Sequence, residues 1–197
     1  MKTVCALGLF LVAVLSLLMV RQSPVEEVDI VVNPYGVSPL SAVCEVFSNR
    51  PVQVAQIDIE GVRTLHSSSY LSRRHSIQLA GLNPGRQTLR LTVFDEEGRQ
   101  VYCPDTEVTV APLPDDLPEI RVLRSEPQLG GYVFCQLESP SQGYQMILTP
   151  LGEIVWFRAR APRSVLGRRL PSGRLLNLNF RAGFVETEEL TGRRLAS

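Results

Sequence analysis

Residues 86–112, RQTLRLTVFDEEGRQVYCPDTEVTVAP, contain the most regular pattern of the chain. Leu89, Leu91 and Val93 alternate with polar residues, which is typical of a β-strand with one buried and one solvated face. DEEG, which follows, is typical of a hairpin turn, and TEVTV predicts a further short strand. This stretch therefore predicts antiparallel β-structure.

The same kind of pattern extends over residues 28–111. VDIVVN, AVCEVFS and HSIQLAGL are short apolar or alternating runs, and they are separated by turn residues such as Pro34 and the NPG sequence at 83–85. In PVQVAQIDIEG, the candidate inward positions are Val52, Val54, Ile57 and Ile59. Six or seven short strands with turn signals about every 8–12 residues predict a small β-sandwich over 28–111.

The N-terminus is different, because Val4–Val20 is an uncharged apolar run of 17 residues that follows Lys2. As a helix this run would be about 25 Å long, at the short end of what spans a bilayer. Residues 1–21 therefore indicate a signal peptide or an uncleaved membrane anchor. No A-x-A cleavage site follows, which favours the anchor. Acidic residues follow Arg21, so the bulk of the chain is expected outside the cytoplasm, in the cell envelope.

A proline- and acid-rich segment at 112–119 is interpreted as a stiff linker between two domains. In the region 120–197, TPLGEIVWF and LPSGRLLNLNF repeat a figure of strand, P-x-G-x turn and strand. This punctuation is typical of β-propeller blades, and about one incomplete blade is expected. Trp156 is expected to be a packing residue. The apolar run at 175–185 would then lie at an open blade edge, where a protein partner or an oligomer could bind.

Four cysteines are present, of which Cys5 lies in the N-terminal apolar run. Cys44, Cys103 and Cys135 remain, an odd number, so one bridge at most can form. The candidate disulfide is Cys44–Cys103, which would join two strands of the sandwich. The alternative is three buried thiols without a bridge.

Composition and motifs limit the chemistry. The formal net charge is zero, which gives no reason to expect nucleic-acid binding. No CxxC or other metal-ligand spacing and no cofactor motif is present, so no metal or cofactor is expected. His66 and His75 lie in LHSSSYLSRRHS, which is interpreted as a polar loop. Six arginines between 158 and 174 are interpreted as a solvated blade edge or a surface for further blades: Arg158, Arg160, Arg163, Arg168, Arg169 and Arg174.

The segment NPYGVSPLSAV, residues 33–43, resembles the start of the bacterial arylsulfotransferases, the aryl-sulfate sulfotransferases of the cell envelope. HSIQLAGLNPGRQTLRLTVFDEEG is similar to the next segment of that family, and QMILTPLGEIVWF and RRLPSGRLLNL look like its first blade. FVETEELTGR looks like the edge where a following blade begins. The matching positions in the first segment are Asn33, Pro34, Tyr35, Gly36, Pro39, Leu40 and Ala42.

In this segment a left-handed turn is expected at Gly36, and Tyr35 is expected to anchor the turn through burial of its ring. The resemblance implies a β-sandwich followed by a six-bladed propeller, and sulfuryl transfer from an aryl sulfate to a phenol through a histidine intermediate. The histidines of that family belong to later blades, so His66 and His75 match none of them and no catalytic residue is assigned. The chain alone is therefore expected to be inactive, as the N-terminal portion of such an enzyme. The alternative is a membrane-anchored extracytoplasmic binding module.

Overall fold

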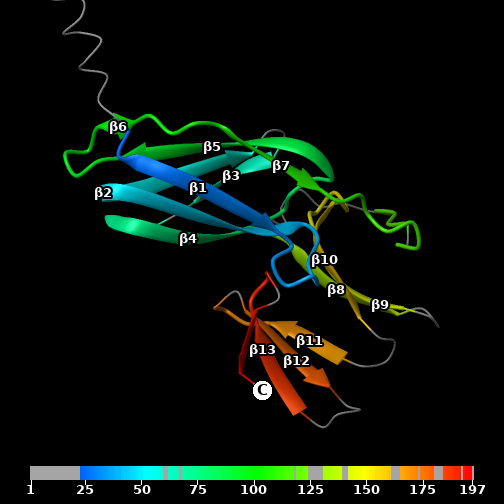
Figure 1. Ribbon diagram of the computed structural model, residues 1–197. Coiled ribbons are helices and arrows are strands. Elements are labelled where there is room, and N and C mark those ends of the chain that lie inside the picture. Colours follow the sequence, from blue (N-terminus) through cyan, green and yellow to red (C-terminus); the bar gives the residue numbers. More distant parts are fainter. Residues whose placement is uncertain are drawn as a thin grey trace, which may run out of the picture.

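The computed structural model describes residues 23–59, 62–66, 68–117, 119–123, 131–138, 142–160, 165–172, 174–179, 184–191 and 193–196. The residues in these ranges form β-strands, turns and loops and contain no helix, so the all-β prediction is confirmed for them (Figure 1). The strands are β1 Val25–Val32, β2 Ser41–Ile59, β3 Val62–His66, β4 Ser72–Ala80, β5 Gly85–Phe94, β6 Gln100–Val101, β7 Thr106–Val110, β8 Val133–Glu138, β9 Gly143–Leu148, β10 Ile154–Arg160, β11 Val165–Arg169, β12 Leu175–Asn179, β13 Phe184–Glu188 and β14 Arg194–Ala196.

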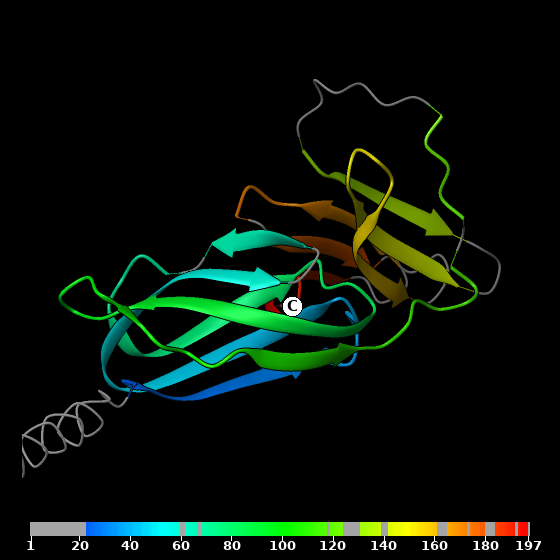
Figure 2. The ribbon, with the colours of Figure 1, turned by 90° about the horizontal axis from the view of Figure 1, so that it is seen from above.

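The first seven strands form one antiparallel sheet around β2, which is 19 residues long. The first half of β2 pairs with β1 and β4, and its second half pairs with β3 and β5. The sheet curls along β2, so that its two halves face each other (Figures 1 and 2). Two separate strands are expected from the sequence at 42–48 and 51–61, but one strand runs through Pro51. Proline is tolerated there because pairing with β4 is interrupted between Phe47 and Val52.

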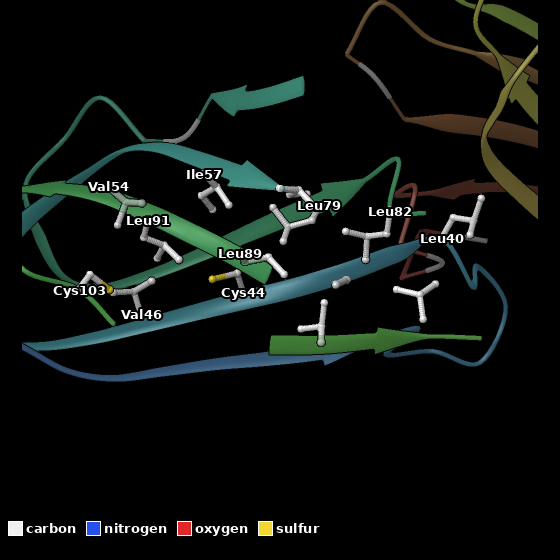
Figure 3. Close-up of a cluster of buried hydrophobic side chains, with 14 of the residues drawn as sticks. Leu40, Cys44, Val46, Val54, Ile57, Leu79, Leu82, Leu89, Leu91 and Cys103 are labelled. Atoms are coloured by element: carbon white, nitrogen blue, oxygen red, sulfur yellow. The ribbon is translucent and has the colours of Figure 1, made fainter. Parts of the chain in front are cut away.

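The main core lies between the two halves of this curled sheet (Figure 3). All four inward positions predicted in the second half of β2 are at most 2% exposed: Val52, Val54, Ile57 and Ile59. The three predicted in β5 are at most 4% exposed: Leu89, Leu91 and Val93. The register between β2 and β5 shifts between Val54 and Gln56, which explains why the inward spacing lengthens by one residue there.

The NPYGVSPL segment forms the hairpin loop between β1 and β2. The Asn33 amide donates to the Ser41 carbonyl oxygen at 2.8 Å, and the Gly36 amide donates to the Asn33 carbonyl oxygen at 2.9 Å. The Asn33 Oδ1 atom accepts a hydrogen bond from the Ser38 amide at 2.9 Å. Asn33 and Gly36 have φ angles of +49° and +69°, which glycine and asparagine adopt more easily than other residues. The left-handed turn predicted at Gly36 is confirmed.

The other motif residues of this loop have unequal roles. Pro34 and Pro39 lie outside both strands, where a missing N–H group costs no sheet pairing. Leu40 is 1% exposed and belongs to the main core. Tyr35 is 47% exposed, so the expectation that its buried ring anchors the turn is wrong. The loop is closed by backbone and asparagine hydrogen bonds instead.

Beyond residue 111, the described chain forms two smaller antiparallel sheets, with strand orders β10-β9-β8 and β11-β12-β13-β14. Both predicted hairpins are present, but β9–β10 and β11–β12 belong to different sheets, so the two repeats do not form one sheet. The propeller blade stays a prediction. The segment 184–193, expected at the edge of a following blade, contributes β13, which pairs with β12. β12 and β13 are inner strands of their sheet, so the apolar run at 175–185 does not lie at an edge of that sheet. The partner or oligomer expected at this run stays a prediction.

The sheet of β8–β10 packs against both other sheets and contributes to two cores (Figure 1). Tyr144 and Met146 of β9 join the main core of the curled sheet. On the other side, Trp156 packs with Leu175 of β12, and its indole N–H donates to the Leu190 carbonyl oxygen at 2.6 Å. The packing role predicted for Trp156 is confirmed, since it is 1% exposed.

The segment predicted as a linker, 112–119, packs along this body. Leu113 and Leu117 contact the main core, and the Tyr144 hydroxyl donates to Asp116 Oδ1 at 2.7 Å. The interpretation of this segment as a domain boundary stays a prediction.

The predicted anchor or signal, residues 1–21, lies outside the described residues. Within the part of the chain that is described, no helix combines the length and the hydropathy needed to cross a bilayer.

Candidate functional site

A compact polar cluster surrounds His75, which lies in β4 and is 1% exposed. Its Nε2 atom lies 2.8 Å from the Val52 carbonyl oxygen, and its Nδ1 atom lies 2.8 Å from Ser68 Oγ. A carbonyl oxygen only accepts hydrogen bonds, so Nε2 carries the hydrogen, and in the neutral ring Nδ1 accepts from the Ser68 hydroxyl. The ring of Tyr70 stacks on the imidazole with 5.4 Å between ring centroids.

This arrangement contains a hydroxyl hydrogen-bonded to an imidazole, which is one element of a nucleophile–base pair. However, both ring nitrogens of His75 are occupied by partners within the fold, and the ring is buried. The cluster therefore ties the loop 68–71 to β2 and β4. The prediction of a polar loop is wrong for His75, because the residue lies in a strand. The backbone of His66 ends β3, but its side chain lies outside the described part.

The two candidate disulfide cysteines, Cys44 and Cys103, are both buried in the main core, where their side chains lie on either side of Val46 in the view of Figure 3. Both are free thiols in this structure, and so is the partly buried Cys135. The Cys44–Cys103 disulfide and the alternative of three buried thiols without a bridge both stay predictions. Burial raises the pKa of Cys44 to about 12, with a smaller contribution from Cys103, and raises the pKa of Cys103 to about 11. Such thiols are poor nucleophiles at neutral pH because almost none of the thiolate is present.

The arginines between 158 and 174 whose side chains the structure describes differ in burial. Arg168 and Arg174 are exposed, as expected for a solvated edge. Arg158 is 5% exposed, so that expectation is wrong for it. The side chains of three further arginines lie outside the described residues: Arg160, Arg163 and Arg169.

Arg174 lines a groove of about 360 Å³ between β4 and the C-terminal sheet. Glu189 and Gln78 also line this groove, and the Gln78 side-chain amide donates to the Glu189 carboxylate. Arg193 lies 2.7 Å from the same carboxylate. These contacts join the first and last sheets, and the sequence contains no signal for them because the partners lie 111 residues apart.

A group of exposed apolar side chains lies around β8 and is called the β8 patch here. The sequence did not predict it. Its members are Val122, Leu123, Tyr132, Val133 and Leu151. A Cβ atom built on Gly152 would lie 2.6 Å from the Val122 side chain, which places Val122 over the turn that contains Leu151. Val133 is opposite Leu148 across the β8–β9 pair, next to the same turn. The signal in the sequence that could have indicated this patch is Leu151, an apolar residue within the turn sequence TPLGE.

In the described ranges, no three His, Cys, Asp or Glu side chains gather closely enough to hold a metal ion. Comparison with known proteins gives no match to any protein-family model, curated protein or solved structure. The function must therefore be argued from the geometry of this chain.

Proposed function

We propose that this chain is a membrane-anchored, extracytoplasmic β-module that binds a protein partner and performs no catalysis itself. The observation that carries the proposal is the β8 patch. Leu123 is 96% exposed, Leu151 71% and Val133 53%. Val133 pairs with Leu148 beside the turn that contains Leu151, and Leu123 follows Val122, whose side chain lies over that turn. Exposed apolar groups that cluster in this way typically mark interaction surfaces. β8 is the last strand of the order β10-β9-β8, so the patch also lies at an end of its sheet.

The polar groups support the same proposal. An acceptor histidine in a sulfuryl transfer needs an unoccupied ring nitrogen that faces the donor. Both nitrogens of His75 are instead held by Ser68 and Val52. The thiols of Cys44 and Cys103 are buried and protonated at neutral pH. These groups stabilise the fold and offer no reacting atom.

Site-specific photo-cross-linking in isolated envelopes tests the patch. A photoreactive residue at position 151 should give one defined adduct, whereas the same residue at Val31, which is 45% exposed, should give none. The variant Leu123→Asp should abolish the adduct, and its 96% exposure makes it a mild change to the fold. Equal adducts from both positions, or an adduct that persists in Leu123→Asp, would refute a role for the patch. The mass of the adduct distinguishes another protein from a second copy of the chain.

The intact mass of the protein recovered from membranes tests the anchor. A mass near 21.9 kDa is expected if residues 1–21 are retained. A lighter species that begins after residue 21 would show that the segment is a cleaved signal and would remove the anchor from the proposal.

The second candidate is the N-terminal portion of an arylsulfotransferase-like envelope protein. The four strands β11–β14 favour it, because they follow one another in sequence and in space, as the strands of a propeller blade do. In both candidates the chain alone should release no phenol from 4-nitrophenyl sulfate in the presence of a phenolic acceptor. Turnover that disappears in His75→Ala but persists in a variant at an exposed site would contradict the absence of catalysis.

A further inference from the structure

The end of the curled sheet at which the described chain begins carries an unusual set of exposed side chains. Tyr102 is 76% exposed, Tyr70 is 59% exposed and Leu71 is 49% exposed. Arg50 and Arg73 are exposed at the same end and form no ion pair among the described residues. Figures 1 and 2 both show that the start of β1, the bend of β2, the start of β4 and the β5–β6 turn meet at this end.

The chain is pinned to this end at its first described residues. The Ser23 hydroxyl donates to the Tyr102 carbonyl oxygen and accepts from the Val25 amide at 3.2 Å. The Asn49 amide donates to the Pro24 carbonyl oxygen at 2.9 Å. Only Arg21 and Gln22 separate Ser23 from Val20, the last residue of the apolar run. Even fully extended, the three Cα–Cα steps from Val20 to Ser23 span roughly 10 Å, so this end of the sheet cannot move far from the apolar run.

We infer that this end is a bilayer-contact surface, which rests on the phospholipid headgroups next to the proposed anchor. This inference rests on the proposed function, because it requires residues 4–20 to lie in the membrane. With the anchor inserted, the short tether holds Tyr102 and its neighbours at the headgroup layer. Tyrosine is enriched at that depth because its ring is apolar and its hydroxyl stays hydrated.

The charges at this end fit the phosphate group that zwitterionic and anionic phospholipids share. Arg50 and Arg73 are available for it, and a guanidinium binds phosphate through two parallel hydrogen bonds. Arg99 is already paired with Asp95 at 2.8 Å in the β5–β6 turn. The exposed Glu96 of the same turn opposes a strongly anionic surface. Glu26 and Glu27, which are exposed at the start of β1, oppose it as well. Contact is therefore expected with phosphatidylcholine alone, without a requirement for anionic lipid.

Tyrosine labelling of the full chain in phosphatidylcholine vesicles tests the inference. The reagent is lactoperoxidase with iodide, because an enzyme of that size cannot reach residues that face a bilayer. Exposed fractions of 76% and 47% predict that, without a bilayer, Tyr102 is labelled faster than Tyr35, which lies in the β1–β2 loop at the other end. Bilayer contact reverses this order and also protects Tyr70. Flotation of the vesicles shows independently whether the chain is anchored.

Two charge-reversal variants sharpen the test. Arg50→Glu combined with Arg73→Glu should restore fast labelling of Tyr102, whereas the control Arg168→Glu combined with Arg174→Glu should leave it protected. A chain that floats with the vesicles and is labelled faster at Tyr102 than at the opposite end overturns the inference and leaves the anchor standing. Protection that survives reversal of both arginines overturns their role as phosphate ligands. A chain that does not float refutes the anchor and the contact surface together.

Discussion

Cys44 provides a prediction of how stability depends on pH. Its side chain is fully buried, and burial is the main reason why its pKa rises from the ordinary 9.0 to about 12. The unfolded chain ionises this thiol near pH 9, whereas the folded chain keeps it protonated until about pH 12. The unfolded state therefore binds fewer protons within this window, and stability decreases as pH increases. Below pH 9 the thiol is protonated in both states, and its contribution is fully present.

The size of the effect follows from the two pKa values. Each pH unit between them costs about 1.4 kcal/mol of unfolding free energy, which gives about 2 kcal/mol at a pH of about 10.5. The complete difference corresponds to about 4 kcal/mol at pH 12. These values are upper bounds for this one thiol, because a small opening of the core would let it ionise in the folded chain.

Urea unfolding of the full chain in mild detergent and reducing buffer measures the effect, at pH 8 and at a pH of about 10.5. The wild type should lose about 2 kcal/mol more than Cys44→Ala between the two conditions. Val46→Ala is the matched control, since Val46 is equally buried on the same strand and has no group to titrate. It should keep the pH dependence of the wild type. If Cys44→Ala shows the same dependence as the wild type, the thiol ionises in the folded protein and the reasoning from burial fails.

Four further substitutions test particular contacts by urea unfolding. His75→Ala should cost about 3 kcal/mol, because it opens a cavity and leaves a buried carbonyl without its donor; a loss below about 1 kcal/mol would argue against the two hydrogen bonds of the ring. Trp156→Phe should cost about 1–2 kcal/mol through the lost indole donor to Leu190, and an unchanged midpoint would contradict that bond. Gly98→Ala and Gly152→Ala form a matched pair, with φ angles of +72° and +84°. Gly98→Ala should lower the free energy of unfolding by about 1 kcal/mol through backbone strain alone. Gly152→Ala should lower it more, because its new Cβ atom would also lie within 3 Å of the Val122 side chain. Equal losses in the two variants would refute the steric clash at Gly152.

Strand faces were predictable from the sequence to the level of single residues. The inward positions of β5 follow from strict alternation, since successive side chains of a pleated strand point to opposite faces. Ile57 and Ile59 were also identified, although a bulge lengthens the spacing from Val54, because each pair alternates on its own side of the bulge. The turn at Gly36 was predictable for a similar reason, since the conformational freedom of glycine is a local property.

The polar cluster and the exposed groups were not predictable in this way. His75 lies among serines and arginines in the sequence, and it is buried only because β4 pairs with β2 at Val46. Tyr35 follows a proline in a turn, and nothing in that context distinguishes a buried ring from an exposed one. The β8 patch depends on Val122, which the sequence separates from Leu151 by a long stretch and the fold brings to the same turn.

The sequence by itself determined that this chain is built from short antiparallel strands, and which side chains of several strands face a core. Only the tertiary structure decided that β2 is one bent strand that belongs to both halves of a curled sheet. It also decided that the two repeated hairpins lie in different sheets, and that two tyrosines and two arginines gather at the end where the described chain begins. The physical reason is that alternation encodes the face of a residue and turn residues encode a reversal, both over a few positions. The partner of each strand is selected by burial and pairing between segments that are far apart in the chain.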